Sequence, residues 1–228
     1  MNEKMLIAAH KAWKKGEAAE NLQRSTLRSA YHRGLDDRDT SLSGVNFLAG
    51  RARELANLAL TSEEEIYWAT ASHDFYIESA SLYATRGDKA RQLNVLSRAS
   101  ELSESLFSFT RDFKWANSAI DEKVADAELY LELGKKDAAA FSLAIAANIA
   151  GKFASRAGRE GSVPFREKIC EFNIRSGQLF LEVGDRRRAI TSHHILRETA
   201  YSLMELTGDP KYSSWIEIGD RFFESLNK

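Results

Sequence analysis

The sequence contains very little cysteine and very little proline. Cys170 is the only cysteine among 228 residues, so the chain can form no internal disulfide and no thiolate metal cluster, and a reducing compartment fits best. The only prolines are Pro164 and Pro210, and each follows a short turn-like segment. Because proline breaks helix interiors but is tolerated in a first turn, this scarcity favours long helices that begin at the two prolines.

Long apolar runs and a strong net charge are also missing. The N-terminal apolar run from Met5 to Ala9 is too short for a signal peptide and far shorter than a membrane span. The formal net charge of -1 removes general attraction to nucleic acid or to acidic membranes. We therefore expect a cytoplasmic protein that does not insert into membranes and does not bind nucleic acid, and any charge-driven binding must come from local patches.

The common motifs of enzymes and cofactor sites do not occur in the sequence. It has no glycine-rich phosphate loop, no His-Glu-x-x-His zinc helix and no Gly-x-Ser-x-Gly nucleophile elbow. Those patterns carry phosphate binding, metal-assisted hydrolysis and acyl transfer, respectively. We therefore expect no cofactor, no metal and no catalytic residues of these classes.

The distribution of apolar residues predicts an all-α fold. With 43% hydrophobic and 29% charged residues the chain can bury a core. Apolar residues recur at steps of three and four, as in Phe165, Ile169 and Phe172, and no segment alternates in the manner of a strand. Ser62 and Glu65 suggest a capping box for one helix. The predicted helices, about ten in number, cover residues 3–15, 17–33, 44–60, 62–86, 88–110, 116–133, 137–156, 164–183, 186–206 and 210–227.

A short pattern recurs three times along the chain. It consists of a small residue, an aromatic three later, a glycine seven later and an alanine twelve later. Small residues let paired helices approach, the aromatic fills the space between them, and the glycine adopts the turn conformation. The copies are Ala80, Tyr83, Gly87 with Gln92 in place of alanine; Ala127, Tyr130, Gly134, Ala139; and Gly177, Phe180, Gly184, Ala189.

These residues resemble the tetratricopeptide family, whose first helix follows the pattern Trp-x-x-Leu-Gly-x-x-Tyr. The glycines Gly87, Gly134 and Gly184 are 47 and 50 residues apart, against about 34 in a standard repeat. Longer hairpins are therefore needed, as in divergent members such as the soluble NSF attachment proteins. The resemblance implies antiparallel helix hairpins stacked as a TPR-like α-solenoid, a superhelix.

The resemblance also implies a domain organisation. We expect residues 1–228 to form a single α-solenoid, with atypical helices in 1–60 and TPR-like hairpins in 61–228. A partial fourth copy, Trp215, Ile218, Gly219 and Phe222, suggests a C-terminal capping helix. The first helices either begin the same superhelix or pack across its groove and occlude it, and a break is expected at 34–43.

In such solenoids the first helix of each pair lines a concave groove, and here that face is rich in carboxylates. Arg175 is the one basic residue expected there. We therefore predict a noncatalytic interaction module, a scaffold or adaptor, that binds a basic peptide or protein surface by long-range attraction. The alternative is that the carboxylates only keep the face hydrated. The predicted groove residues are Glu78, Asp121, Glu128, Glu132, Glu171, Gln178, Glu182, Asp220 and Glu224.

Cations cluster at the turns between the predicted helices. They are expected to form either a solvated edge or a docking strip for phosphate or an acidic partner. This basic edge comprises Lys135, Lys136, Arg186, Arg187 and Arg188.

A ribonuclease is the alternative function. Arg187 and His194 are separated by six residues, a spacing that resembles the Arg/His pair of HEPN-type ribonucleases, which act across a dimer. His193 instead falls on an apolar stripe with Ala189 and Leu196, where a core role is expected. The orientation of His193 distinguishes the interaction module from the ribonuclease. The sequence leaves open whether the protein forms a homodimer.

Overall fold

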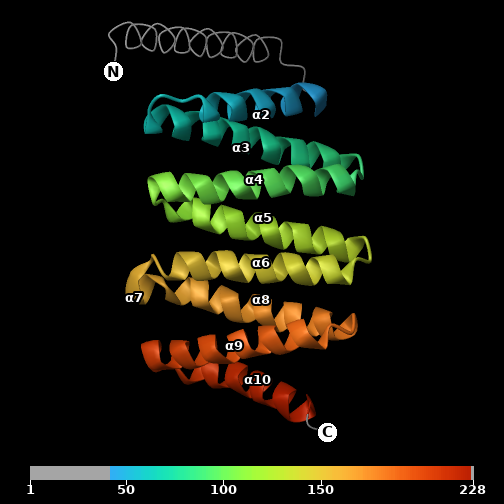
Figure 1. Ribbon diagram of the computed structural model, residues 1–228, viewed down its shortest axis with the longest axis vertical. Helices are drawn as coiled ribbons and strands as arrows, with labels where there is room; N and C mark the ends of the chain where they lie inside the picture. The colour runs from blue at the N-terminus through green and yellow to red at the C-terminus, as the bar shows by residue number, and fades with distance from the viewer. Residues whose placement is uncertain (1–41, 227–228) are drawn as a thin grey trace, which may run out of the picture. The chain divides into compact units, whose positions relative to one another are not determined.

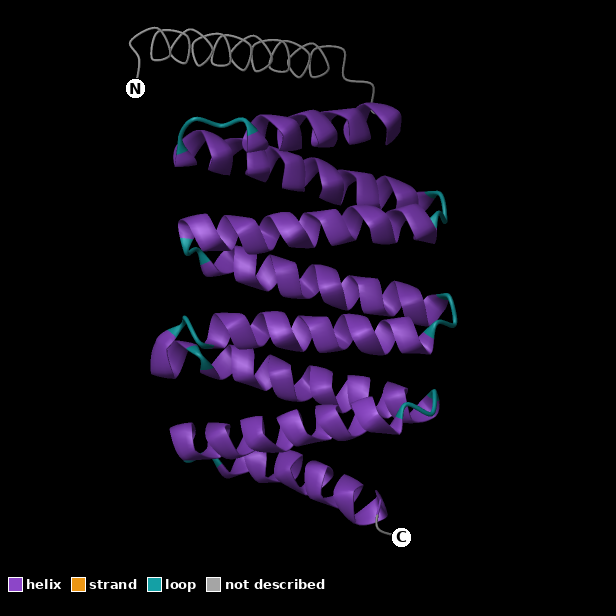
Figure 2. Cartoon of the chain, viewed as in Figure 1, coloured by secondary structure: helices purple, strands orange, loops and turns teal. Residues whose placement is uncertain are grey.

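The computed structural model describes residues 42–226, and every regular element in that range is helical (Figure 1, Figure 2). The all-α prediction is therefore confirmed for this part of the chain. A short helix α7 (Gly158–Gly161) and a 3₁₀ turn η1 (Pro210–Tyr212) accompany eight long helices. The long helices are α2 (Leu42–Asn57), α3 (Ser62–Thr85), α4 (Lys89–Thr110), α5 (Phe113–Glu132), α6 (Lys136–Ala154), α8 (Val163–Glu182), α9 (Arg186–Thr207) and α10 (Ser213–Leu226).

The expected total of about ten helices is not reached among the described residues. The eight long helices correspond one to one with the eight predicted from residue 44 onward. The helices predicted at 3–15 and 17–33, and most of the break at 34–43, lie outside the described residues. At Pro210 the chain forms the turn η1 before α10 begins at Ser213, so the last helix starts three residues later than predicted.

The described helices belong to two compact units that divide within α4. Unit 1 contains α2, α3 and most of α4, and unit 2 contains residues 103–107 and 111–226. The boundary expected at residue 60, between the atypical helices and the TPR-like hairpins, falls between α2 and α3. These two helices pack together inside unit 1. Within unit 2, α6 packs on α5 and α8, α9 packs on α8, and α10 packs on α9, so each long helix contacts its neighbours in the chain.

The glycines of the recurring pattern form the same turn three times. Gly87, Gly134 and Gly184 have φ of 68°, 71° and 80°, the left-handed region that favours glycine. In each turn the backbone N–H that follows the glycine donates to the carbonyl of the pattern's aromatic residue, at 2.8 Å for Lys135 to Tyr130. This arrangement satisfies carbonyls that the helix end would otherwise leave without a donor.

A pair of glycine substitutions in unit 1 is expected to have opposite effects on stability. Gly87→Ala should lower the free energy of unfolding by about 1–2 kcal/mol, because an L side chain strains the left-handed backbone. Gly50→Ala should raise it by about 0.5–1 kcal/mol, because Gly50 is helical and no atom lies within 4 Å of the added Cβ. Urea denaturation of both variants measures this, and equal effects of one sign would contradict the turn assignment.

The N-terminal cap of α3 differs from the predicted one by a single residue. The helix begins at Ser62, so Thr61 is the cap, and its side chain accepts a hydrogen bond from the Glu64 backbone N–H at 3.2 Å. The Glu64 carboxylate accepts from the Leu60 N–H at 3.2 Å. The predicted pair Ser62 and Glu65 is therefore wrong, and the adjacent Thr61 and Glu64 perform the capping.

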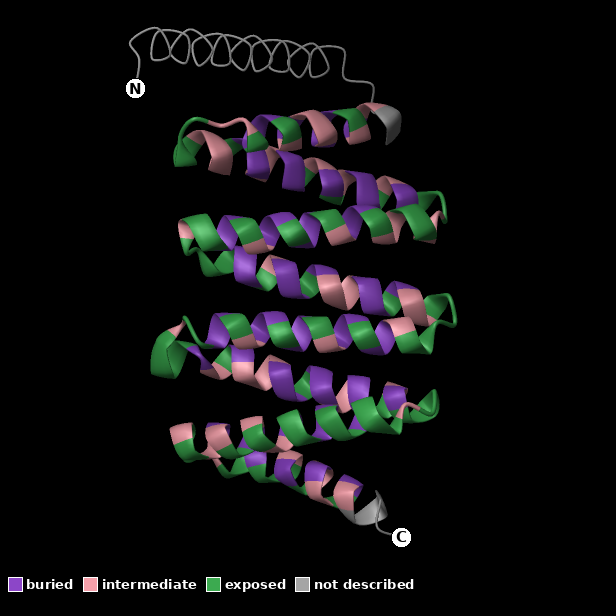
Figure 3. Ribbon diagram, viewed as in Figure 1, coloured by how far each residue is buried: buried purple, intermediate pink, exposed green. Residues whose placement is uncertain are grey.

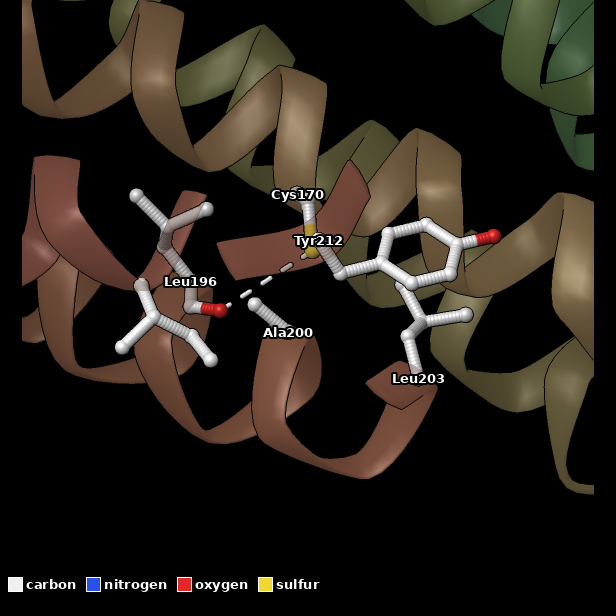
Figure 4. Packing of buried hydrophobic residues seen from close by; sticks show 6 residues of the cluster. Cys170, Leu196, Ala200, Leu203 and Tyr212 are labelled. Carbon is white, nitrogen blue, oxygen red and sulfur yellow. Dashed lines mark hydrogen bonds between the residues drawn. The ribbon is translucent and has the colours of Figure 1, made fainter. Parts of the chain in front are cut away.

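Buried residues recur along the long helices (Figure 3). In unit 2 one apolar cluster joins α8, α9, η1 and α10 through Cys170, Leu196, Ala200, Leu203, Tyr212 and Ile216 (Figure 4). The Tyr212 hydroxyl donates to the Glu167 carboxylate at 2.8 Å. Burial would raise the pKa of Glu167, but hydrogen bonds from Lys211 and Tyr212 outweigh it and hold that pKa below its ordinary value. These contacts fix η1 against α8.

Candidate functional site

Helix α8 carries two opposite sets of side chains. At about 100° of rotation per residue, Ile169, Asn173 and Phe180 lie within about 40° of one another, and they line a cavity together with residues of α6 and α9. Glu171 and Glu182 are displaced from this set by about 160–220° and are exposed to solvent. The two sides of α8 therefore belong to different surfaces.

The carboxylates of α5 lie beside the second of these surfaces. Lys168 of α8 pairs with Asp121 of α5 at 3.6 Å, and Arg175 of α8 pairs with Glu128 of α5. The two ion pairs stand two turns apart along each helix, so the exposed sides of α5 and α8 run alongside each other. We call this surface the acidic face; it comprises the predicted residues Asp121, Glu128, Glu132, Glu171, Gln178 and Glu182.

In two ion pairs of the acidic face the carboxylate is more accessible than its cation, whereas in the third Lys136 and Glu182 are 53% and 50% exposed. The Asp121 side chain is 72% exposed and its partner Lys168 is 29% exposed. Glu128 is 51% exposed against 41% for Arg175. In these two pairs the negative ends therefore project further into solvent, whereas the cations lie along the helix surface.

Sequence reasoning missed most of these cations. Only Arg175 was expected on this face, but Lys168 also belongs to it, and Lys136 at the start of α6 pairs with Glu182 at 2.6 Å. Arg175 and Glu128 are 47 residues apart, whereas Gly134 and Gly184, the turns that follow α5 and α8, are 50 residues apart. The two side chains therefore do not occupy equivalent positions in the aligned copies, and the repeat alone does not predict their pairing.

The other three predicted groove residues belong to helices other than α5 and α8. Glu78 is half-buried on α3 in unit 1. Asp220 of α10 pairs with Arg197 of α9 at 3.5 Å. The side chain of Glu224 is outside the part of the chain that the structure describes. Among the predicted residues, Asp121 and Glu128 of α5 are connected to α8 by ion pairs.

The buried side of α5 holds two further carboxyl groups. Ser103 donates to Glu122 at 3.3 Å, and Lys123 pairs with Asp126 at 3.0 Å. Burial raises the pKa of Asp126, and the nearby Glu122 adds to that rise while Lys123 opposes it. Glu122 and Asp126 are both buried and are not accessible to a partner in this conformation.

The residues of the ribonuclease alternative have different environments within the described chain. His193 is 4% exposed and stacks on Phe222, with ring centroids 3.8 Å apart and planes 14° apart. Both of its ring nitrogens lack a hydrogen-bond partner among the described residues, and burial lowers its pKa. Arg187 and His194 are exposed, and no contact joins them in the described part of the chain. The core role expected for His193 is confirmed.

The basic edge is partly neutralised by neighbouring carboxylates. Arg188 pairs with Asp185 at 2.6 Å, and its guanidinium lies 4.2 Å from the centre of the Phe141 ring. Lys136 is engaged by Glu182, as described above. Lys135, Arg186 and Arg187 are exposed. Of the five cations of the edge, Lys136 and Arg188 are therefore paired with carboxylates.

Cys170 is buried on α8. Burial raises the pKa of the Cys170 thiol to about 12, and its sulfur lies 3.8 Å from the Leu196 carbonyl (Figure 4). Over the range 42–226, no group of three His, Cys, Asp or Glu side chains is placed to hold a metal ion. Across that range, no helix combines the length and apolar character needed to cross a membrane.

Comparison with known proteins leaves the family open. No family model matches the chain, and no curated protein matches it. Among solved structures the chain is similar to BtubC (BKLC) from P. vanneervenii, with 15% identity over 92% of each chain and a TM-score of 0.30. At this TM-score the similarity carries no argument about function, and the tetratricopeptide resemblance rests on the residues of this chain alone.

Proposed function

We propose that the protein is a noncatalytic interaction module whose acidic face binds a basic peptide or a basic protein surface. The observation that carries this proposal is the alignment of exposed carboxylates on α5 and α8, bridged by Lys168 and Arg175. A preformed rigid surface with one prevailing charge suits a partner of opposite charge.

The bridging ion pairs themselves indicate how a ligand would bind. Each is exposed, and exposed pairs contribute only about 0–1 kcal/mol. A lysine or arginine of a partner can therefore replace Lys168 or Arg175 at Asp121 or Glu128 with little cost in stability. The internal cations keep the surface hydrated and compete with weak, nonspecific binding until a partner presents several charges at once.

We propose further that the hairpins stack as a TPR-like α-solenoid. The three equivalent glycine turns support this, since they give successive hairpins the same geometry. The order of packing in unit 2, where each helix contacts its neighbours in the chain, is the one that such a solenoid requires. The acidic face would then belong to the surface formed by the first helix of each pair.

The test exploits the internal cations. Arg175→Gln frees Glu128 and removes a competing charge, so a short fluorescent peptide rich in lysine and arginine should bind about fivefold more tightly. Glu171→Lys should weaken binding by a similar factor, because Glu171 is an exposed member of the face. Fluorescence anisotropy at about 20 mM and about 200 mM salt measures both effects, which should shrink at the higher salt.

Arg159→Gln is the matched control, since it makes the same change in net charge at an exposed position of α7. It should leave the affinity within about twofold of the starting protein. Equal strengthening by Arg159→Gln and Arg175→Gln would show that only net charge matters and would remove the acidic face as the site. Absence of binding at low salt would end the proposal.

A further inference from the structure

A second surface of unit 2 has a different character from the acidic face. Helices α6, α8 and α9 line an open cavity of about 410 Å³ on the side of α8 that lies opposite the acidic face. Its walls are largely apolar and include Phe141 of α6, Ile169 of α8 and Ile195 of α9. Phe141 and Ile195 are each 41% exposed, which is high for large apolar side chains that lie on the same surface. We call this cavity the apolar groove.

The shape of the apolar groove fits a helix. On α6 its lining runs from Phe141 to Gly151, and on α9 from Arg188 to Thr199. At 1.5 Å per residue each wall is about 15–17 Å long, the length of three helical turns. The α9 wall uses Arg188, Thr191, Ile195 and Thr199, at steps of three and four, so one stripe of α9 faces the groove throughout. An amphipathic helix would place its apolar stripe between the two walls.

The charges at the ends of the groove select the chemistry of that helix. Arg188 stands at one end, where it stacks on Phe141 and uses only part of its donor set on Asp185. At the other end Arg166 donates to the Ser202 hydroxyl at 2.7 Å, one turn beyond Thr199. Within the described residues no carboxylate lies within ion-pair distance of Arg166. Both ends therefore present guanidinium groups able to receive carboxylates.

We propose that the apolar groove binds an amphipathic helix of a partner protein whose apolar stripe is flanked by Asp or Glu at both ends. This partner differs in charge from the one proposed for the acidic face, and the two surfaces lie on opposite sides of α8. The module would then hold a basic and an acidic partner at the same time. The inference does not require the acidic face to bind anything.

The experiment uses the full chain and three fluorescent helical peptides. One has a leucine stripe with glutamates at both ends, the second has lysines in place of those glutamates, and the third is a scrambled version of the first. We expect the acidic peptide to bind at least about tenfold more tightly than either of the others. Phe141→Glu and Ile195→Glu should each weaken the acidic peptide about tenfold or more, since both side chains are exposed and line the groove.

Two matched controls separate the groove from general effects of the substitutions. Ile145→Glu introduces the same charge on α6 at a 45% exposed isoleucine outside the lining and should leave binding unchanged. Arg188→Glu should abolish the preference for the acidic peptide, whereas Arg187→Glu, one residue away and outside the lining, should preserve it. Circular dichroism of each variant confirms that the helices are retained.

Other occupants of the groove would appear as distinct results, and each overturns the proposal. A preference for the lysine peptide would indicate a partner of the opposite charge. Self-association that Ile195→Glu disrupts in sedimentation analysis would assign the groove to a second copy of this chain. Equal loss of binding in Ile145→Glu, or no binding of any peptide, would leave the groove without a helical ligand. Binding of the basic peptide to the acidic face should be unchanged in Phe141→Glu, so failure of one proposal is distinguishable from failure of the other.

Discussion

Replacement of Phe153 by alanine is expected to lower the free energy of unfolding by about 3–5 kcal/mol. The Phe153 side chain is 2% exposed, and its ring centroid lies 4.4 Å from that of Phe107 and 6.1 Å from that of Phe165. The three rings join α6 to the end of α4 and the start of α8. Truncation removes these contacts and leaves a cavity that the surrounding helices cannot fill completely. Urea denaturation followed by circular dichroism measures the loss.

Ile145→Ala is the control on the same helix. Its side chain is 45% exposed, so the substitution should change the free energy of unfolding by less than about 1 kcal/mol. If Phe153→Ala also lowered the free energy of unfolding by less than about 1 kcal/mol, the contact among α4, α6 and α8 would not be part of the core of unit 2.

Gly177→Ala is expected to destabilise the protein by about 1–3 kcal/mol, although alanine is normally the better helix former. An added Cβ would lie 2.9 Å from Nε2 and 3.0 Å from Cδ2 of His193. The imidazole cannot move away easily, because it is buried and stacks on Phe222. The glycine therefore sets the distance between α8 and α9, and thermal unfolding of the variant should reveal the strain.

Gly151→Ala distinguishes this clash from an ordinary glycine effect. Its added Cβ would meet only Ile169 Cδ1 at 3.8 Å, an ordinary contact, so a gain of about 0.5–1 kcal/mol is expected from helix propensity. In a protein that already carries His193→Ala, the cost of Gly177→Ala should largely disappear. If the full cost persists there, His193 is not its cause.

The helices and their turns were predictable because local chemistry determines them. Scarce proline and apolar spacing gave the eight long helices, and Gly87, Gly134 and Gly184 could be assigned to turns because a glycine after a helical stripe indicates a left-handed residue. The predicted N-cap of α3 was wrong by one residue because Thr61 and Ser62 are both residue types that cap helices well. Only the backbone decides which of the two precedes the helix.

The surfaces were less predictable because they depend on pairing between distant segments. The acidic residues of α5 and α8 could be assigned to exposed helix surfaces from their spacing. Their partners Lys168 and Lys136 come from another helix, which the pattern of a single helix does not show. The apolar groove was missed for a similar reason. Phe141 and Ile195 are about 50 residues apart, and each alone is an ordinary apolar position of an amphipathic helix.

The most direct test of the central claim, that the acidic face receives a basic partner, is a nuclear magnetic resonance titration of the full chain with the lysine- and arginine-rich peptide. We expect the amide signals of the exposed sides of α5 and α8 to shift first, including Asp121, Glu128, Glu171 and Gln178. Signals of Phe141 and Ile195 on the opposite side should stay in place. Shifts concentrated at the apolar groove or the basic edge, or no shifts at low salt, would contradict it.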